Sequence, residues 1–156
     1  MIIGSGVISM KNKSQSGFSL LELLIVVAVI AIIASLAIPN LQNSKKAAYE
    51  AAAIAYMRSW TSAQELYSMR HGTYADADNQ LVGDGFIGNP DPDAQGYTFS
   101  IDNGPGSTTT WWGRGWPTRA GITGDRHFYI DNSGVIRWSL AGNASAASPP
   151  LGDPGP

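Results

Sequence analysis

The chain has 156 residues, a formal net charge of −2 at pH 7 and no cysteine. This length suggests one globular domain with appendages, and the slightly acidic charge argues against a nucleic-acid-binding surface. Without cysteine, the chain can form neither disulfide bonds nor thiolate metal sites.

The first 17 residues are predicted to be a leader peptide. The stretch MIIGSGVISMKNKSQSG carries two lysines, Lys11 and Lys13, and no acidic residue. Met10 is an alternative start to Met1, because MKNKSQSG is by itself a short basic leader.

Residues 18–39 form an apolar segment that is long enough to cross a membrane. The 21 residues from Phe18 to Ile38 contain one charge, Glu22. A helix of that length spans about 31 Å, close to the hydrocarbon thickness of about 30 Å. Lysines flank the segment on both sides, so the charge rule leaves its orientation open. These lysines are Lys11, Lys13, Lys45 and Lys46.

Two ordinary interpretations of this segment leave Glu22 unexplained. One is a simple membrane anchor. The other is a secretory signal peptide cut after Ala37, although such peptides have an apolar core of only about 7 to 15 residues. An ionised side chain in a membrane helix costs about 2.5 to 3.5 kcal/mol at mid-bilayer and less near an interface. Glu22 therefore needs a partner.

An amphipathic helix is predicted over residues 40–72. Pro39 lacks an amide hydrogen and predicts a kink where this helix begins. Apolar residues then recur at three-, four- and seven-residue spacing, which places them on one face. The face comprises Tyr49, Ala52, Ala53, Tyr56, Trp60, Ala63 and Tyr67, with Glu50, Arg58 and Glu65 off it. The helix is expected to end at MRHG, where Gly72 suits a left-handed cap.

The rest of the chain predicts a small antiparallel sheet. A connecting loop covers residues 73–95, and the head, residues 96–140, contains the strand candidates. These are YTFSI (97–101), TTTWW (108–112), RHFYI (126–130) and VIRWSL (135–140), the last with Ile136, Trp138 and Leu140 on one face. Residues 141–156 are poor in large apolar residues and predict a flexible tail.

Strands with one apolar face need a cover, and the apolar face of the helix supplies one. The predicted fold class is therefore α+β. A long kinked N-terminal helix, with an apolar first half and an amphipathic second half, packs on a small antiparallel sheet of three to four strands.

The stretch SGFSLLELLIVVAVIAIIASLAIPNL resembles the class III signal of bacterial type IV pilins and of their relatives, the pseudopilins of type II secretion. The glycine, phenylalanine, glutamate and proline agree with that family in spacing. The resemblance implies that a prepilin peptidase cuts after Gly17 and methylates the new amine of Phe18. It also implies that Glu22 pairs with the Phe18 amine of a neighbouring subunit and that Pro39 kinks the helix.

The resemblance indicates a structural protein that is not an enzyme and has no cofactor or metal. A type IV pilin is a single-pass inner-membrane precursor that becomes part of an extracellular filament of identical subunits, with the pilus assembly machinery as its partner. A pseudopilin of a type II secretion system is the alternative within the family. The alternative from another class is a membrane-tethered enzyme or sugar-binding domain.

One motif raises the possibility of a metal site, whereas the two histidines do not. DPDAQGYTFSID, residues 91–102, matches a calcium loop in part, with acids at positions one, three and twelve. Pro92 and the predicted strand favour an ordinary turn instead. The two histidines, His71 and His127, have neither metal-site nor catalytic-triad spacing.

Three further motifs are open to more than one interpretation. WWGRGW, residues 111–116, is a candidate sugar-binding patch, although packing in the core or at a subunit interface is the simpler explanation. An aromatic electron path along the helix is likewise explained by packing on the sheet. The NAS triplet at Asn143 fits a glycosylation acceptor.

Overall fold

The computed structural model describes residues 17–89, 96–102 and 109–153. The predicted leader, apart from Gly17, lies outside the described residues, as do Asp91 and Asp93 of the calcium-loop motif. The chain divides after Ile38 into two compact units.

Helix α1 runs from Leu20 to His71 and contributes to both units. The chain is helical on both sides of Pro39, and the kink predicted there stays a prediction. The predicted end of the helix is confirmed. Gly72 has a φ of 75°, and its amide donates a 2.8 Å hydrogen bond to the carbonyl of Ser68. Glycine suits this left-handed position because it has no Cβ to clash with the backbone.

The second unit contains a four-stranded antiparallel sheet with the strand order β1-β2-β3-β4. The strands are β1 (Tyr97–Asp102), β2 (Trp112–Pro117), β3 (His127–Asp131) and β4 (Arg137–Ser139). A short helix, α2 (Asp78–Gly83), lies within the predicted connecting loop. The α+β fold is confirmed. The strand predicted at residues 108–112 is wrong in position, because β2 begins at its last residue.

Two glycines explain the position of β2. In WGRGWP the buried Gly113 and Gly115 alternate with more exposed, larger side chains. A Cβ at Gly113 would collide with the ring of Trp60, and one at Gly115 would lie 3.1 Å from the sulfur of Met57. The side chains of Trp60 and Met57 can therefore lie directly against this strand. Glycine also has a low β propensity, so a strand that contains two glycines is not expected from the sequence.

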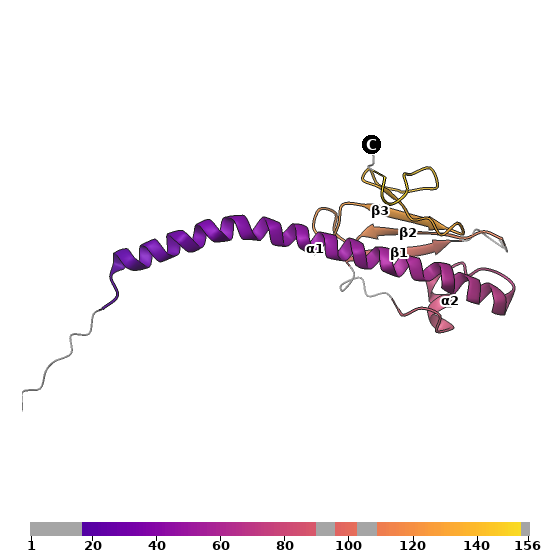
Figure 1. Cartoon of the computed structure of the whole chain (residues 1–156). Helices are drawn as coiled ribbons and strands as arrows, with labels where there is room; N and C mark the ends of the chain where they lie inside the picture. The colour runs from indigo at the N-terminus through magenta and orange to yellow at the C-terminus, as the bar shows by residue number, and fades with distance from the viewer. Residues whose placement is uncertain (1–16, 90–95, 103–108, 154–156) are drawn as a thin grey trace, which may run out of the picture. The chain divides into compact units, whose positions relative to one another are not determined.

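The core lies between the second half of α1 and one face of the sheet, as Figure 1 shows. Phe99 of β1 packs against Tyr56 and Trp60, with ring centroids 4.7 and 5.8 Å apart. The helix contributes Ala53, Met57, Trp60 and Ala63, and the sheet side contributes Tyr97, Ile101, Trp111, Phe128 and Ile130. The predicted packing of an aromatic and alanine-rich helix face on the sheet is confirmed.

Two polar residues of α1 are buried, and helical spacing predicted neither. Glu50, predicted to lie off the face, is only 8% exposed, and its carboxylate accepts hydrogen bonds from the guanidinium of Arg126 and the amide of Asp125. Gln64 is fully buried and forms two hydrogen bonds with the backbone of Ala75, at 2.8 and 3.0 Å. Partners distant in sequence make both burials possible, and helical periodicity does not reveal such partners.

The end of the chain also differs from prediction. The amide of Trp138 donates to the carbonyl of Pro149 at 3.0 Å, and the amide of Leu151 donates to that of Ile136 at 2.8 Å. The described part of the predicted flexible tail thus covers the edge of β4, since backbone hydrogen bonds need no large side chains. Leu140, predicted on the apolar face, is 59% exposed because β4 ends at Ser139.

Candidate functional site

The predicted assembly residues lie at the start of α1. Gly17, Phe18 and Ser19 precede the helix, and Glu22 lies in its first turn, where the helix dipole favours a carboxylate. Phe18 is 74% exposed, and Glu22 is exposed as well. Both residues are therefore accessible to groups from outside the chain.

The first unit exposes its apolar surface. The large apolar side chains between Phe18 and Ile38 are 45% to 81% exposed. This part of α1 is long and apolar enough to cross a membrane, and its most apolar stretch is not buried within the described residues. Small residues occur along it, and they allow close helix approach: Ala28, Ala31, Ala34, Ser35 and Ala37. An apolar surface of this extent is stable only against lipid or other chains.

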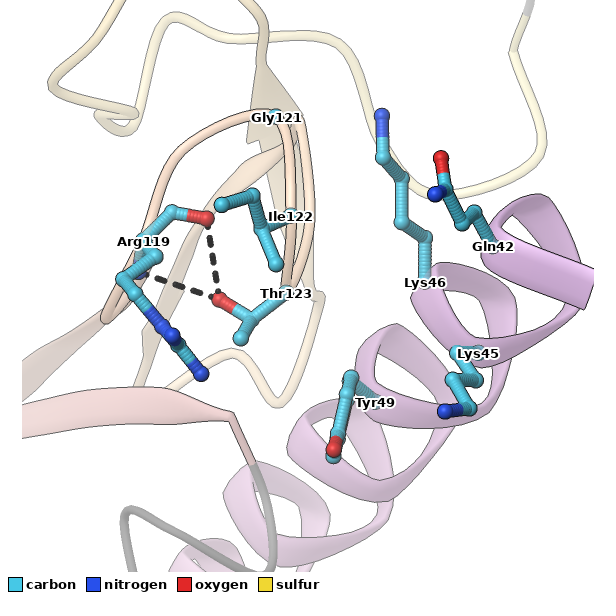
Figure 2. Close-up of a pocket in the computed structure, with 8 residues that line it drawn as sticks. All are labelled: Gln42, Lys45, Lys46, Tyr49, Arg119, Gly121, Ile122 and Thr123. Atoms are coloured by element: carbon cyan, nitrogen blue, oxygen red, sulfur yellow. Dashed lines mark hydrogen bonds between the residues drawn. The ribbon is translucent and has the colours of Figure 1, made fainter. Parts of the chain in front are cut away.

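The second unit contains a basic pocket of about 340 Å³. One wall is the start of the second half of α1, and the other is the loop between β2 and β3, as Figure 2 shows. The helix supplies Gln42, Lys45, Lys46 and Tyr49. The loop supplies Arg119, Gly121, Ile122 and Thr123. We call this the basic pocket below.

Internal hydrogen bonds shape the loop wall of the basic pocket. The hydroxyl of Thr123 accepts from the amide of Arg119 at 3.1 Å and lies 3.2 Å from the carbonyl of the same residue, and Figure 2 marks both contacts. The amides of Ile122 and Thr123 also donate to the carbonyl of Arg119. Gly121 has a φ of 79°, which glycine adopts without strain.

Two ion pairs tie the end of this loop to α1. Lys46 Nζ lies 3.1 Å from a carboxylate oxygen of Asp125, and Arg126 Nη2 lies 2.7 Å from Glu50 Oε2. The hydroxyl of Tyr97 donates to the carbonyl of Arg126 at 2.8 Å, and burial raises the pKa of Tyr97 above its ordinary value of 10.0. The pocket is therefore held by contacts between residues about 75 to 80 positions apart in the chain.

Comparison with known proteins identifies the N-terminal segment. A family model, the prokaryotic N-terminal methylation motif, matches residues 12–38. The chain is 36% identical over 89 residues to the type IV wide pilus major component PilA4 of Thermus thermophilus. It is 30% identical over 72 residues to the type II secretion system core protein G of Aeromonas hydrophila. These similarities support a place for the chain in the type IV pilin superfamily.

The two similarities cover parts of the chains compared. They include 57% of this chain and 65% of the pilus component, and 46% of this chain and 50% of the secretion protein. The chain thus spans about half to two thirds of the length of the curated relatives it matches. One relative belongs to a pilus and the other to a secretion system, and neither is named as an enzyme. The two similarities therefore support a pilin or pseudopilin subunit.

Each histidine occupies the element predicted for it. His71 ends α1, where its Nε2 lies 2.6 Å from a carboxylate oxygen of Asp84 and its ring stacks on Tyr67. The hydrogen bond from His71 lowers the pKa of Asp84. His127 begins β3. Within residues 17–89, 96–102 and 109–153, no group of three or more histidine, aspartate or glutamate side chains is placed to hold a metal ion.

The aromatic motif WWGRGW is divided between the two faces of the sheet. Trp111 is 1% exposed and belongs to the core. Trp112 stacks on Tyr129 at 6.2 Å, with the guanidinium of Arg114 over its ring, and Trp116 is 36% exposed. The motif therefore combines a core residue with an outer surface, and sugar binding at that surface stays a prediction.

The helix aromatics contact their neighbours as packing predicts. Tyr56 and Trp60 lie 5.7 Å apart, and both contact Phe99 of the sheet. Burial raises the pKa of Tyr56 to about 12. The glycosylation of Asn143 stays a prediction.

The basic pocket was not predicted from the sequence. In the sequence, Lys45 and Lys46 bear only on the orientation of the membrane segment, and no motif includes Arg119. One signal was visible, because these two lysines are the only ones after residue 17 and they are adjacent. The fold decides that these lysines line one pocket together with Arg119.

Proposed function

We propose that this chain is made as a prepilin, cut after Gly17, methylated on the new Phe18 amine and assembled into an extracellular type IV pilus. The observation that supports this proposal most strongly is the exposed apolar segment, which lies within the region matched by the N-terminal methylation motif. The similarity to a major pilus component supports a pilus subunit in particular.

In this proposal Glu22 neutralises the positive amine of Phe18 in a neighbouring subunit. A buried charge without a partner is strongly destabilising, whereas a buried pair is tolerable and fixes the register of association. The membrane holds the precursor until the apolar segment transfers from lipid to the filament core. The inner membrane, the prepilin peptidase and the assembly machinery are then the partners of the chain.

Mass spectrometry of the mature protein tests the processing step. We expect an N-terminus at Phe18 with one added methyl group. An intact leader, or a terminus at Ile38 as a secretory signal peptide would leave, contradicts the proposal. Shearing of cells tests the assembly step, since a major pilin should dominate the sheared filaments.

A type II secretion pseudopilin is the second candidate, and the similarity to a secretion core protein supports it. Processing at Phe18 is the same in both cases, so the two candidates differ in location. A pseudopilin should stay in the cell envelope, and its deletion should block secretion of folded proteins while surface filaments remain unchanged. Filaments that disappear from the sheared fraction on deletion favour the pilus.

A further inference from the structure

The basic pocket has an excess of positive charge in a chain that is acidic as a whole. Three cations line it, Lys45, Lys46 and Arg119, and one carboxylate beside it, Asp125, pairs with Lys46. Glu50 is engaged with Arg126 instead. Among the residues that the structure describes, neither Lys45 nor Arg119 has an acidic partner within ion-pair distance. Three cations against one carboxylate leave about two positive charges, which favour an anionic ligand.

The other lining groups suit a phosphate that carries an apolar tail. Gln42 and Tyr49 have side-chain donors, and a guanidinium binds phosphate oxygens through its planar fork of N–H groups. Ile122 lines the same pocket and is 59% exposed. The side chain of Ile122 is apolar and poorly solvated by water, although Lys45 and Arg119 beside it are charged. The boundary between lipid head groups and acyl chains accommodates both kinds of side chain.

The position of the pocket in the chain brings it near a bilayer. Lys45 follows Ile38, the last residue of the membrane-crossing segment, by seven residues. Seven residues reach about 25 Å when fully extended and about 10 Å as a helix. The head groups of the leaflet that the segment enters are therefore within reach of the pocket.

We infer that the basic pocket binds the phosphate of an anionic phospholipid while the chain resides in the membrane. The inference rests on the proposed membrane-resident precursor. Lys45 and Arg119 contact the phosphate oxygens, Lys46 stays paired with Asp125, and Ile122 contacts the glycerol and the upper acyl chain. The lipid would hold the folded head against the bilayer until the subunit leaves for the filament.

The test titrates the purified full chain, in detergent micelles, with phosphatidylglycerol or phosphatidylcholine and counts bound lipid by native mass spectrometry. We expect tighter binding of phosphatidylglycerol. Each of Lys45→Gln and Arg119→Gln should weaken it about fivefold, the effect of one basic residue near an anionic surface. Arg58→Gln removes an exposed cation of the same helix outside the pocket and should leave the binding of this lipid unchanged.

Three outcomes would overturn the inference. Equal affinity for the two lipids shows that the pocket does not read the anionic head group. Equal losses from Arg58→Gln and Arg119→Gln show that binding depends only on overall charge. Displacement of the lipid by inorganic phosphate in modest excess shows that the pocket takes a soluble anion. Because the titration uses purified protein, failure of Phe18 methylation or of filament formation contradicts the proposed function without changing this measurement.

Discussion

The two halves of α1 both carry apolar residues but differ in what covers them. Between Phe18 and Ile38, each large apolar side chain is at least 45% exposed. In the second half, Met57 and Trp60 are fully buried against the sheet. Backbone hydrogen bonds within the segment are sufficient to make the first half helical. Its large apolar side chains remain largely exposed. Among the described residues, nothing from this chain covers the apolar side chains of the first half, whereas the sheet covers those of the second half.

The largest effect is expected from removing Glu22, the one charged residue of the first half. Glu22→Val should leave the chain in the membrane but reduce sheared filaments to below about a tenth of the wild-type amount, because an unpaired buried amine costs several kcal/mol. Quantitative blotting of membrane and filament fractions measures both effects. Leu23→Val is the matched control, and it should assemble. Normal filaments from Glu22→Val cells would refute the charge pair.

A pair of truncations compares the halves directly. Trp60→Ala should lower the free energy of unfolding of the head by about 3 to 5 kcal/mol, since it empties a fully buried site. Ile33→Ala should leave it unchanged, since Ile33 is 62% exposed. Chemical unfolding of the detergent-solubilised chain, followed by circular dichroism, gives both values. Equal losses from the two variants would show that the first half also depends on partners within the chain.

The close approach of α1 to β2 can be tested at a glycine. Gly113→Ala should destabilise the head by about 1 to 3 kcal/mol, because the new methyl group meets the rigid ring of Trp60. Gly83→Ala serves as the control, since a Cβ there meets nothing within 4 Å. The same unfolding experiment measures both. An unchanged stability of Gly113→Ala would mean that the helix does not lie against this strand.

The buried ion pair of the head contrasts with the proposed pair of the filament, since both partners lie in one chain. Glu50→Ala should cost about 2 kcal/mol, below the range for fully buried pairs because the side chain of Arg126 is 33% exposed. Glu50→Gln keeps an acceptor for the amide of Asp125 and should cost less. Filament yield should follow the loss of stability, in contrast to Glu22→Val, which should abolish assembly without unfolding the head.

The smallest expected effect concerns the end of α1. The pKa of Asp84 lies below its ordinary value of 3.8, first because of the hydrogen bond from His71. The ionised carboxylate therefore stabilises the fold above about that pH, and this contribution is lost as the pH falls through the lowered pKa. The thermal unfolding midpoint of Asp84→Asn should lie slightly below that of the wild type at pH 5 and converge with it in stronger acid. A difference that persists in strong acid would point to a cause other than this charge.

Short-range signals account for the parts of the fold that were predicted. The helix ends at His71 because Gly72 suits the left-handed cap, and β3 and β4 follow from alternating apolar residues around a glycine-containing turn. The errors arise where a distant partner decides the outcome. Glu50 is buried by Arg126, and residues 149–151 are held by the backbone of β4. Neither partner can be identified from spacing.

By itself, the sequence determined the apolar first half of α1, its single glutamate, the glycine and phenylalanine before it, and the resemblance to type IV pilins. These are local properties, because composition and short spacing decide helix formation, apolar character and the match to a short motif. Only the tertiary structure decided that two glycines of β2 admit Trp60 and Met57, and that Lys45 and Lys46 line the same pocket as Arg119. Those features join residues more than 50 positions apart, and a one-dimensional pattern contains no information on which distant residues the core brings together.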